Sequence, residues 1–349
     1  MKIGVIFGGI STEHKVSVVS GTSVIKNLNK TKYQIYPLYI KEDGSWYHLL
    51  DNVLDIDIYK IGNVPTNIKK VDNVIDFLNE MDILFPVLHG IGGEDGSIEG
   101  LFTLLKKPYV GCGILSSALC MDKVYTKIIL EKANILVTPS IYLKKSMNDI
   151  TYIDESFNNT IVNIKDISNL IKEKFNYPVF IKPSNSGSSV GISKVNNEES
   201  LDKALTEAFI YDSKVLIEKL IVGHEVECAV LNNIASSVGE VISAEDFYTF
   251  DAKYKNNESK TVIPANIDES LINKIKDISL KAFASVDGFG IARVDFFIEK
   301  DTNKTYLNEI NTMPGFTEIS MYPKLIENIG ISYTELLDEL INHSLKARN

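Results

Sequence analysis

Four polar side chains near the carboxyl end of the chain combine residue types that suit a hard metal ion and an anion. They are Arg293, Asp295, Glu309 and Asn311. The apolar runs that carry them, residues 290–297 and 305–311, are β-prone, and the polar segment 299–304 between them predicts a hairpin. Side chains two apart on a strand share a face. Two carboxylates and an amide oxygen on one face favour Mg²⁺, and the guanidinium would hold an anion that the metal also contacts. The alternative is a surface hairpin with scattered charges.

A lysine and a serine- and glycine-rich loop indicate a second place for an anion. Lys182 lies near the end of the apolar run 177–183, and residues 184–192 after it are mostly serine and glycine. Ammonium, hydroxyl and backbone N–H groups can together bind phosphate oxygens. The loop is not a Walker A motif, because no Gly-Lys-Ser/Thr follows its glycines.

Acidic and aromatic residues further along the chain fit a nucleotide site. Glu218 and Glu225 lie on either side of the end of a strand predicted over residues 215–221. There they could read an adenine amino group and a ribose hydroxyl, and a plain β-hairpin is the alternative. The segment 246–254 is rich in aromatic residues and could cover a site and exclude water.

The amino-terminal third predicts an open parallel α/β sheet. A strand over residues 2–7, a glycine turn, a helix and a strand over 33–39 form a βα unit, and Glu13 lies at the helix start. An acid there fits a ligand site and helix-dipole stabilisation equally well. A strand over 83–88 ends in a glycine-rich loop with His89 and Glu94, which favours a functional loop over a flexible surface loop.

The elements between these sites are less distinct. A helix is predicted from Ser116 to Lys132, after the first domain ends near residues 111–113. Residues 144–175 are polar and predict a variable connection with one weak helix near 167–174.

Composition narrows the class of protein. The chain has 349 residues, which favours two or three domains, and 44% of them are hydrophobic. A net charge of −10 without a basic run excludes a nucleic-acid partner. The three cysteines have no metal or disulfide spacing, and no apolar run reaches membrane-spanning length. We expect no leader peptide, because the sequence runs directly into an apolar strand. We therefore expect a cytoplasmic protein with no membrane partner. A dehydrogenase is excluded because no dinucleotide fingerprint follows Phe7.

Taken in order, these segments resemble the D-alanine–D-alanine ligase family of ATP-grasp enzymes over nearly the whole chain. Eight motifs carry the resemblance: FGGISTEHKVS (7–17), LHG with GEDG (88–90, 93–96), MDK (121–123), IKP with GSSVG (181–183, 187–191), EK with Glu225 (218–219), AKY (252–254), ARVD (292–295) and NEINTMPGFT (308–317). Each motif alone is of modest specificity, but eight in this order are very specific.

The resemblance implies a role for each matching residue. Contacts with ATP are implied for Lys123, Lys182, Ser189, Glu218, Lys219, Glu225 and Lys253. Ligation of two Mg²⁺ ions, with Mn²⁺ as an alternative ion, is implied for Asp295, Glu309 and Asn311. Substrate contacts are implied for Glu13, His89, Arg293, Ser320 and Met321. A catalytic set is implied of Glu13, linked through Ser188 to Tyr254 in a closing lid, and of Arg293 with the backbone of Gly315 at the tetrahedral intermediate.

The resemblance also implies the fold and the reaction. The fold would be α/β, with an amino-terminal open parallel (Rossmann-like) domain over residues 1–115, and an ATP-grasp fold made of a central subdomain (116–222) and a carboxyl-terminal subdomain (223–349). The expected reaction joins two D-alanines through a D-alanyl phosphate, at the cost of ATP, for peptidoglycan precursor synthesis. The expected enzyme is a homodimer. Tyr254 favours an amine as the second substrate. A D-alanine–D-serine ligase and a catalytically inactive nucleotide-binding relative are the alternatives.

Overall fold

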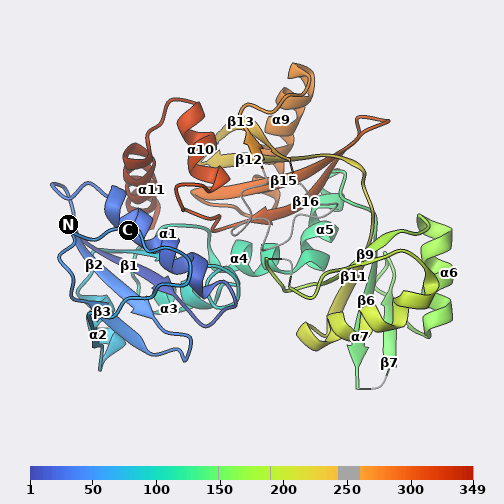
Figure 1. The fold of residues 1–349 in the computed structure, drawn as a ribbon, viewed down its shortest axis with the longest axis horizontal. Coiled ribbons are helices and arrows are strands. Elements are labelled where there is room, and N and C mark those ends of the chain that lie inside the picture. Colours follow the sequence, from blue (N-terminus) through green and yellow to red (C-terminus); the bar gives the residue numbers. More distant parts are fainter. Residues whose placement is uncertain (148, 189, 243–259, 349) are drawn as a thin grey trace.

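The computed structural model describes residues 1–147, 149–188, 190–242 and 260–348. They form three β-sheets, each with its own helices, and Figure 1 shows the first sheet apart from the second, with the third beside both. Within these described ranges no helix is long and apolar enough to cross a membrane.

The first sheet has the strand order β4-β3-β2-β1-β5 and confirms the predicted parallel core. Its parallel strands are β1 (Lys2–Gly8), β2 (Gln34–Ile40) and β5 (Ile83–Val87). Two antiparallel edge strands, β3 (Trp46–Leu49) and β4 (Ile68–Lys70), extend it. Its helices are α1 (His14–Asn27), α2 (Val74–Asn79) and α3 (Ser97–Leu104). Because β1 and β5 are buried along almost their whole length, they read in the sequence as continuous apolar runs.

The single helix predicted from Ser116 to Lys132 is wrong. The segment forms two helices, α4 (Ile114–Met121) and α5 (Lys123–Lys132), which are separated at Asp122. Asp122 has an extended backbone (φ −88°, ψ 99°), and its carboxylate accepts hydrogen bonds from the N–H groups of Val124 and Tyr125. The chain breaks there because this N-cap satisfies the first N–H groups of a new helix.

The second sheet has the order β10-β9-β11-β6-β7-β8, and all its strand pairs are antiparallel. Its strands are β6 (Ser140–Ser146), β7 (Asp149–Ile153), β8 (Asn159–Val162), β9 (Val179–Pro183), β10 (Ser193–Val195) and β11 (Lys214–Lys219). The elements packed with it are α6 (Ile164–Lys174), α7 (Leu201–Tyr211) and the short 3₁₀-helix η1 (Glu198–Ser200).

Residues 144–175 were predicted as a variable connection with one helix. The helix is confirmed, but the rest of the prediction is wrong. The strands β7 and β8 pair there and extend the sheet beyond β6. Both lie at its exposed margin, where no residue of either strand is fully buried, so the apolar alternation that reveals a strand is weak. The helix α6 is present and begins with a capping box formed by Asn163 and Asp166.

The third sheet has the order β14-β13-β12-β15-β16. Its strands are β12 (Gly223–Leu231), β13 (Ile234–Ile242), β14 (Lys260–Val262), β15 (Ile291–Glu299) and β16 (Thr305–Asn311), and its helices are α9 (Glu269–Ser285), α10 (Met321–Asn328) and α11 (Tyr333–Arg348). The predicted hairpin is confirmed as β15 and β16. The alternative hairpin around Gly223 is wrong, because β11 and β12 belong to different sheets.

The first and third sheets share a hydrophobic core. Side chains of α1, such as Val18 and Ile25, are in one buried cluster with Phe316, Tyr322 and Leu336 from the carboxyl-terminal region. The helices α4 and α5 pack toward the third sheet, where Cys120 and Leu130 enter its second core. The three sheets are therefore held close enough to build one site between them.

Candidate active site

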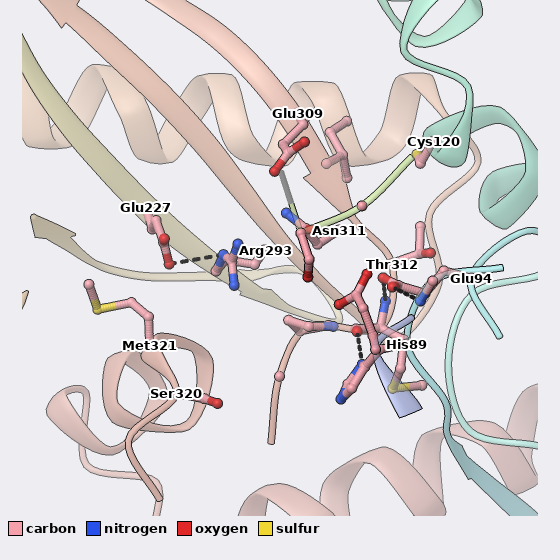
Figure 2. A pocket seen from close by; sticks show the side chains of 18 of the residues that line it. His89, Glu94, Cys120, Glu227, Arg293, Glu309, Asn311, Thr312, Ser320 and Met321 are labelled. Atoms are coloured by element: carbon pink, nitrogen blue, oxygen red, sulfur yellow. Dashed lines mark hydrogen bonds and ion pairs between the residues drawn. The ribbon is translucent and has the colours of Figure 1, made fainter. Parts of the chain in front are cut away.

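A cavity of about 130 Å³ lies where the three sheets meet (Figure 2). Of the residues implied by the resemblance it is lined by Glu13, His89, Lys123, Ser188, Arg293, Glu309, Asn311, Gly315, Ser320 and Met321. Its volume is below the few hundred Å³ of a pocket for a drug-sized ligand, so it suits a small molecule such as an amino acid.

The register of the β15–β16 hairpin confirms that the four polar residues share one face. Arg293 is the cross-strand partner of Asn311, and Asp295 is the partner of Glu309. Arg293 donates to both carboxylate oxygens of Asp295, from Nε at 2.7 Å and from Nη2 at 2.6 Å. The Nδ2 of Asn311 donates to Asp295 Oδ2 at 3.0 Å. Asp295 thus holds the guanidinium and the amide in fixed positions on this face.

A fifth polar residue on this face, Glu227, was missed in the sequence. It lies on β12 directly opposite Asp295, and its Oε2 lies 2.9 Å from Arg293 Nε. Figure 2 shows Arg293 between Glu227 and Asn311. Burial alone would lower the pKa of Arg293, but Asp295 and Glu227 raise it well above its ordinary value. The signal in the sequence was the spacing of Glu225 and Glu227, two apart in an apolar run.

The predicted metal ligands fit a hard cation by their chemistry. Asp295 and Glu309 are cross-strand partners that offer carboxylate oxygens, and Asn311 adds an amide group. Both carboxylate oxygens of Asp295 accept hydrogen bonds from Arg293 in this structure. Over the described ranges no cluster of three or more His, Cys, Asp or Glu side chains could hold a metal ion. A metal here would therefore need the amide and further ligands in addition to the two carboxylates.

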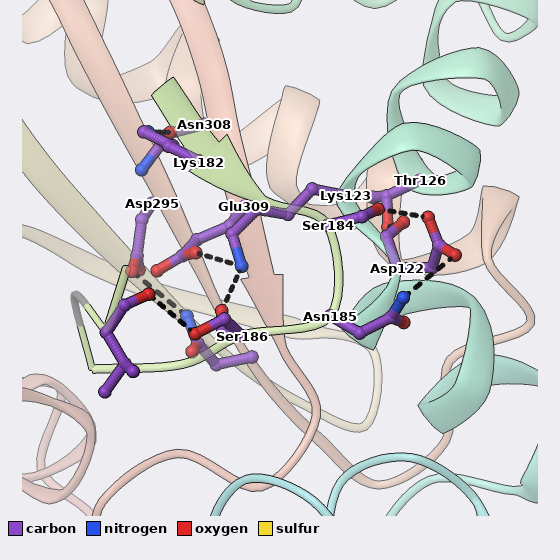
Figure 3. Close-up of polar contacts among 12 residues, drawn as sticks. Asp122, Lys123, Thr126, Lys182, Ser184, Asn185, Ser186, Asp295, Asn308 and Glu309 are labelled. Atoms are coloured by element: carbon purple, nitrogen blue, oxygen red, sulfur yellow. Dashed lines mark hydrogen bonds and ion pairs between the residues drawn. The ribbon is translucent and has the colours of Figure 1, made fainter. Parts of the chain in front are cut away.

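The serine- and glycine-rich loop is held against the start of α5 (Figure 3). Lys123 Nζ donates to the backbone oxygen of Ser186 at 2.6 Å and lies 3.8 Å from Glu309 Oε2. Asp122 accepts from Ser184 Oγ at 2.6 Å and forms an ion pair with Lys214. The break between α4 and α5 thus places a lysine and an acid where both contact the loop.

Glu13 lies between two glycine loops. A Cβ added to Gly187 would lie 2.3 Å from Glu13 Oε1, and one added to Gly90 would lie 3.1 Å from the same atom. Beside Gly187, Ser188 has a positive φ of 48° and lines the cavity. The predicted site residues Ser189, Lys253 and Tyr254 lie outside the described residues.

His89 is buried, and its imidazole contacts two other segments of the chain. Its Nδ1 lies 3.1 Å from the backbone oxygen of Met313, so Nδ1 donates, and its Nε2 lies 2.9 Å from Ser20 Oγ, from which it accepts. Burial lowers the pKa of His89. The histidine therefore joins the end of β5 to the loop after β16.

Glu94 contributes a second join between the same two segments. Its carboxyl group accepts from the N–H of Gly90 at 2.7 Å and from that of Met313 at 3.4 Å. Burial and the nearby Glu13 raise the pKa of Glu94 to about 8. From the sequence, Glu94 was expected only to belong to a functional loop, with no role of its own in the site.

Three of the residues expected to contact the nucleotide, Lys182, Glu218 and Lys219, lie on strands of the second sheet. None of the three lines the cavity, whereas Lys123 does. Glu218 Oε2 forms an ion pair with Lys182 at 2.6 Å, and Lys182 Nζ lies 3.5 Å from Asn308 Oδ1. Lys219 forms an ion pair with Glu299 at 2.8 Å, which links the second sheet to the third. Glu225 is half-buried at the start of β12.

Ser320 and Met321 lie at the start of α10, where they line the cavity with Gly315. Ser320 Oγ accepts from the N–H of Thr317 at 3.0 Å. This contact fixes the loop that leads from Gly315 into the helix.

Comparison with known proteins agrees with this architecture. A family model described as D-ala D-ala ligase N-terminus matches residues 2–112, and one described as D-ala D-ala ligase C-terminus matches residues 147–342. The D-alanine–D-alanine ligase of Acetivibrio thermocellus is 44% identical over 100% of this chain and 96% of its own length. D-alanine–D-alanine ligase B of Clostridium tetani is 46% identical over 98% of this chain and 92% of its own.

Solved structures are similar over the same extent. The VanG D-Ala:D-Ser ligase from Enterococcus faecalis is 35% identical, with a TM-score of 0.82, over 98% of this chain and 99% of its own. The D-alanine–D-alanine ligase from Coxiella burnetii is 32% identical, with a TM-score of 0.82, over 100% of this chain and 94% of its own. The ligase from Bacillus anthracis, solved in complex with ATP, is 29% identical with a TM-score of 0.76, over 100% of this chain and 98% of its own. Two family models match the two parts of the chain, and identity exceeds 40% over at least 92% of the length of the curated relatives named above. The chain therefore belongs to the D-alanine–D-alanine ligase family.

Proposed function

We propose that this chain joins two D-alanines into D-alanyl-D-alanine with hydrolysis of ATP to ADP. The observation that carries the proposal is the convergence of Arg293, Glu309 and Glu13 with the serine- and glycine-rich loop on one small cavity. Curated ligases of the family are similar over the whole chain, and one similar ligase was solved with ATP bound. The product is a peptidoglycan precursor, and we expect the enzyme to act in the cytoplasm as a homodimer.

The nucleotide would bind between the second and third sheets. We assign its phosphates to Lys123, Lys182, Ser189 and Lys253, and its adenine and ribose ends to Glu218, Lys219 and Glu225. The positions of Lys123 beside the loop and of Lys182 between Glu218 and Asn308 support this assignment. The three domains would follow the three sheets, with boundaries near residues 115 and 222.

The metal would be held by Asp295, Glu309 and Asn311, as two Mg²⁺ ions or Mn²⁺. Bound there, it would neutralise the negative charge that the triphosphate brings to the carboxylates. Lys123, close to Glu309, would add a fixed positive charge on the same side.

A phosphoryl transfer followed by an acyl transfer would give roles to Glu13, Arg293 and Gly315. The carboxylate of the first D-alanine, whose ammonium would contact Glu13, attacks the γ-phosphorus; the bond to the β-phosphate oxygen breaks and ADP leaves. The second amine, once it has lost a proton, attacks the acyl carbon, and inorganic phosphate leaves. Arg293 and the N–H of Gly315 would stabilise the tetrahedral oxyanion, a contribution of about 3 kcal/mol for one such donor.

The remaining residues would position the two substrates and protect the acyl phosphate from water. His89 would orient the loops that hold the first D-alanine. Ser320 and Met321 would meet the carboxylate of the second amino acid. Ser188 would link Glu13 to Tyr254 in a lid that keeps water from the acyl phosphate.

Phosphate release from ATP tests the reaction and its specificity together. We expect release with D-alanine alone and none with L-alanine or D-lactate. The reaction mixture would be analysed for dipeptide with D-alanine and D-serine supplied together. Mixed D-alanyl-D-serine as the main product would reassign the second substrate, and no release with any amino acid would refute ligase activity.

A further inference from the structure

Lys127 is a fully buried lysine for which the proposed reaction has no role. It lies in the middle of α5, and 1% of its side chain is exposed. Its ammonium forms an ion pair with Glu218 Oε1 at 2.9 Å and donates to the backbone oxygen of Thr138 at 3.2 Å. Burying an ammonium costs free energy unless it is paired and hydrogen-bonded. We therefore expect a functional reason for a charged side chain at this buried position.

Glu218 joins Lys127 to Lys182. One carboxylate oxygen contacts Lys127, and the other contacts Lys182 at 2.6 Å. Burial by itself would raise the pKa of Glu218, but the two ammonium groups together hold it at about 2. Glu218 therefore stays ionised at every pH at which the protein would work.

The charges of this buried triad do not cancel. Burial lowers the pKa of Lys127, and the adjoining Glu218 carboxylate opposes that effect. With Lys127 protonated, two ammonium groups face one carboxylate, so the triad carries one net positive charge. If Lys127 were neutral, Glu218 would be the full counter-ion of Lys182, and their pair would carry no net charge. An uncharged pair attracts a polyanion far less than a buried ammonium that keeps its charge.

We propose that Lys127 is a positioning residue for the triphosphate, which acts through Glu218 to leave the charge of Lys182 available to phosphate. The proposal rests on the phosphate-binding role assigned above to Lys182. Side chains four apart lie on one helix face, and Lys123, one turn before Lys127, donates to the serine- and glycine-rich loop. The helix α5 would thus serve the nucleotide directly through Lys123 and indirectly through Lys127.

The test measures the affinity for ATP with Mg²⁺ by titration calorimetry and the KM values for ATP and D-alanine. In Lys127→Met we expect the Kd for ATP to rise about tenfold, within the range of couplings in one charge network, while the KM for D-alanine changes less than about threefold. Lys132→Met removes the same charge from an exposed position of α5 and should leave the ATP affinity unchanged. Thermal unfolding of each variant shows whether it is folded.

A double-mutant cycle separates action through Glu218 from loss of packing. In the Glu218→Gln background, Lys127→Met should change the Kd for ATP by less than about threefold. An equal loss in both backgrounds, or unchanged affinity in Lys127→Met, would overturn the proposal. If Lys127→Met does not fold, two other variants replace it: Lys127→Arg should keep the ATP affinity, and Lys127→Gln should lower it. Equal ATP affinities of these two variants would also overturn the proposal. A wild-type protein that binds no ATP would instead refute the proposed function.

Discussion

Replacement of Gly187 by alanine tests whether the serine- and glycine-rich loop holds Glu13 in its working position. The new Cβ would lie 2.3 Å from Glu13 Oε1, whereas real Cβ contacts stay above 3.0 Å. The carboxylate must therefore move by about 0.7 Å, or the loop must move by the same amount.

The same displacement has unequal effects on stability and activity. The atom in the way is the end of a flexible, half-buried side chain, so its movement should lower the free energy of unfolding by less than about 1 kcal/mol. A misplacement of about 1 Å among positioned groups can reduce the rate about 100-fold. We expect kcat/KM for D-alanine to fall by one to two orders of magnitude on this basis, with little change in the affinity for ATP.

Phosphate release with D-alanine as the varied substrate measures the change in kcat/KM, and thermal unfolding measures stability. Gly100→Ala is the control, because no heavy atom lies within 4 Å of its added Cβ, and it should leave activity unchanged. If Gly187→Ala kept kcat/KM within about threefold of wild type, Glu13 would not act from this position. A severe loss of stability would contradict the argument that the carboxylate can move at small cost.

Three further predictions test the face of the hairpin, the helix break and the buried acid. Glu309→Gln should lower kcat by on the order of 100-fold and weaken the dependence of ATP binding on Mg²⁺ in calorimetry, with an unchanged melting temperature; normal turnover would remove the metal assignment. Asp122→Ala loses the α5 cap and the contacts with Ser184 and Lys214. Urea unfolding should therefore show that the free energy of unfolding falls by about 2 kcal/mol. A fall below about 0.5 kcal/mol would contradict this role of Asp122. Glu94 has a pKa of about 8 in the folded protein against an ordinary 4.5, so the folded state binds more protons between these pH values and stability falls as pH rises through them. Melting temperatures from pH 5 to 9 should fall less steeply in Glu94→Gln, and equal slopes would refute the assignment.

The hairpin at the carboxyl end could be predicted because its signal is local. Arg293 and Asp295 alternate with apolar residues, as do Glu309 and Asn311, so the period of the strand alone puts each pair on one face. The sequence could not say that Arg293 would lie opposite Asn311, because the register depends on the turn and on a bulge after Asp295. The sequence also could not show that β12 pairs with β15 and places Glu227 opposite Asp295.

The failed predictions have a common physical cause. Residues 149–153 and 159–162 form strands at an exposed sheet margin, where pairing with a neighbour and not burial makes the strand. The break at Asp122 has a local part, the N-cap of α5, and a non-local part, the contacts of Asp122 with Ser184, Asn185 and Lys214. The helical pattern continues on both sides of Asp122, and the distant contacts fix this residue as a cap and not as a position inside one helix.

By itself the sequence determined the α/β class, the glycine loops and the types of polar residue in the site, because periodicity and turn chemistry act over a few neighbours. The tertiary structure alone decided which charges meet. Glu218 contacts both Lys127 and Lys182, and Glu13 lies against Gly187, although these residues are separated by tens to more than a hundred positions. The reason is that the energy of a buried charge depends on what the folded chain brings within a few ångström of it.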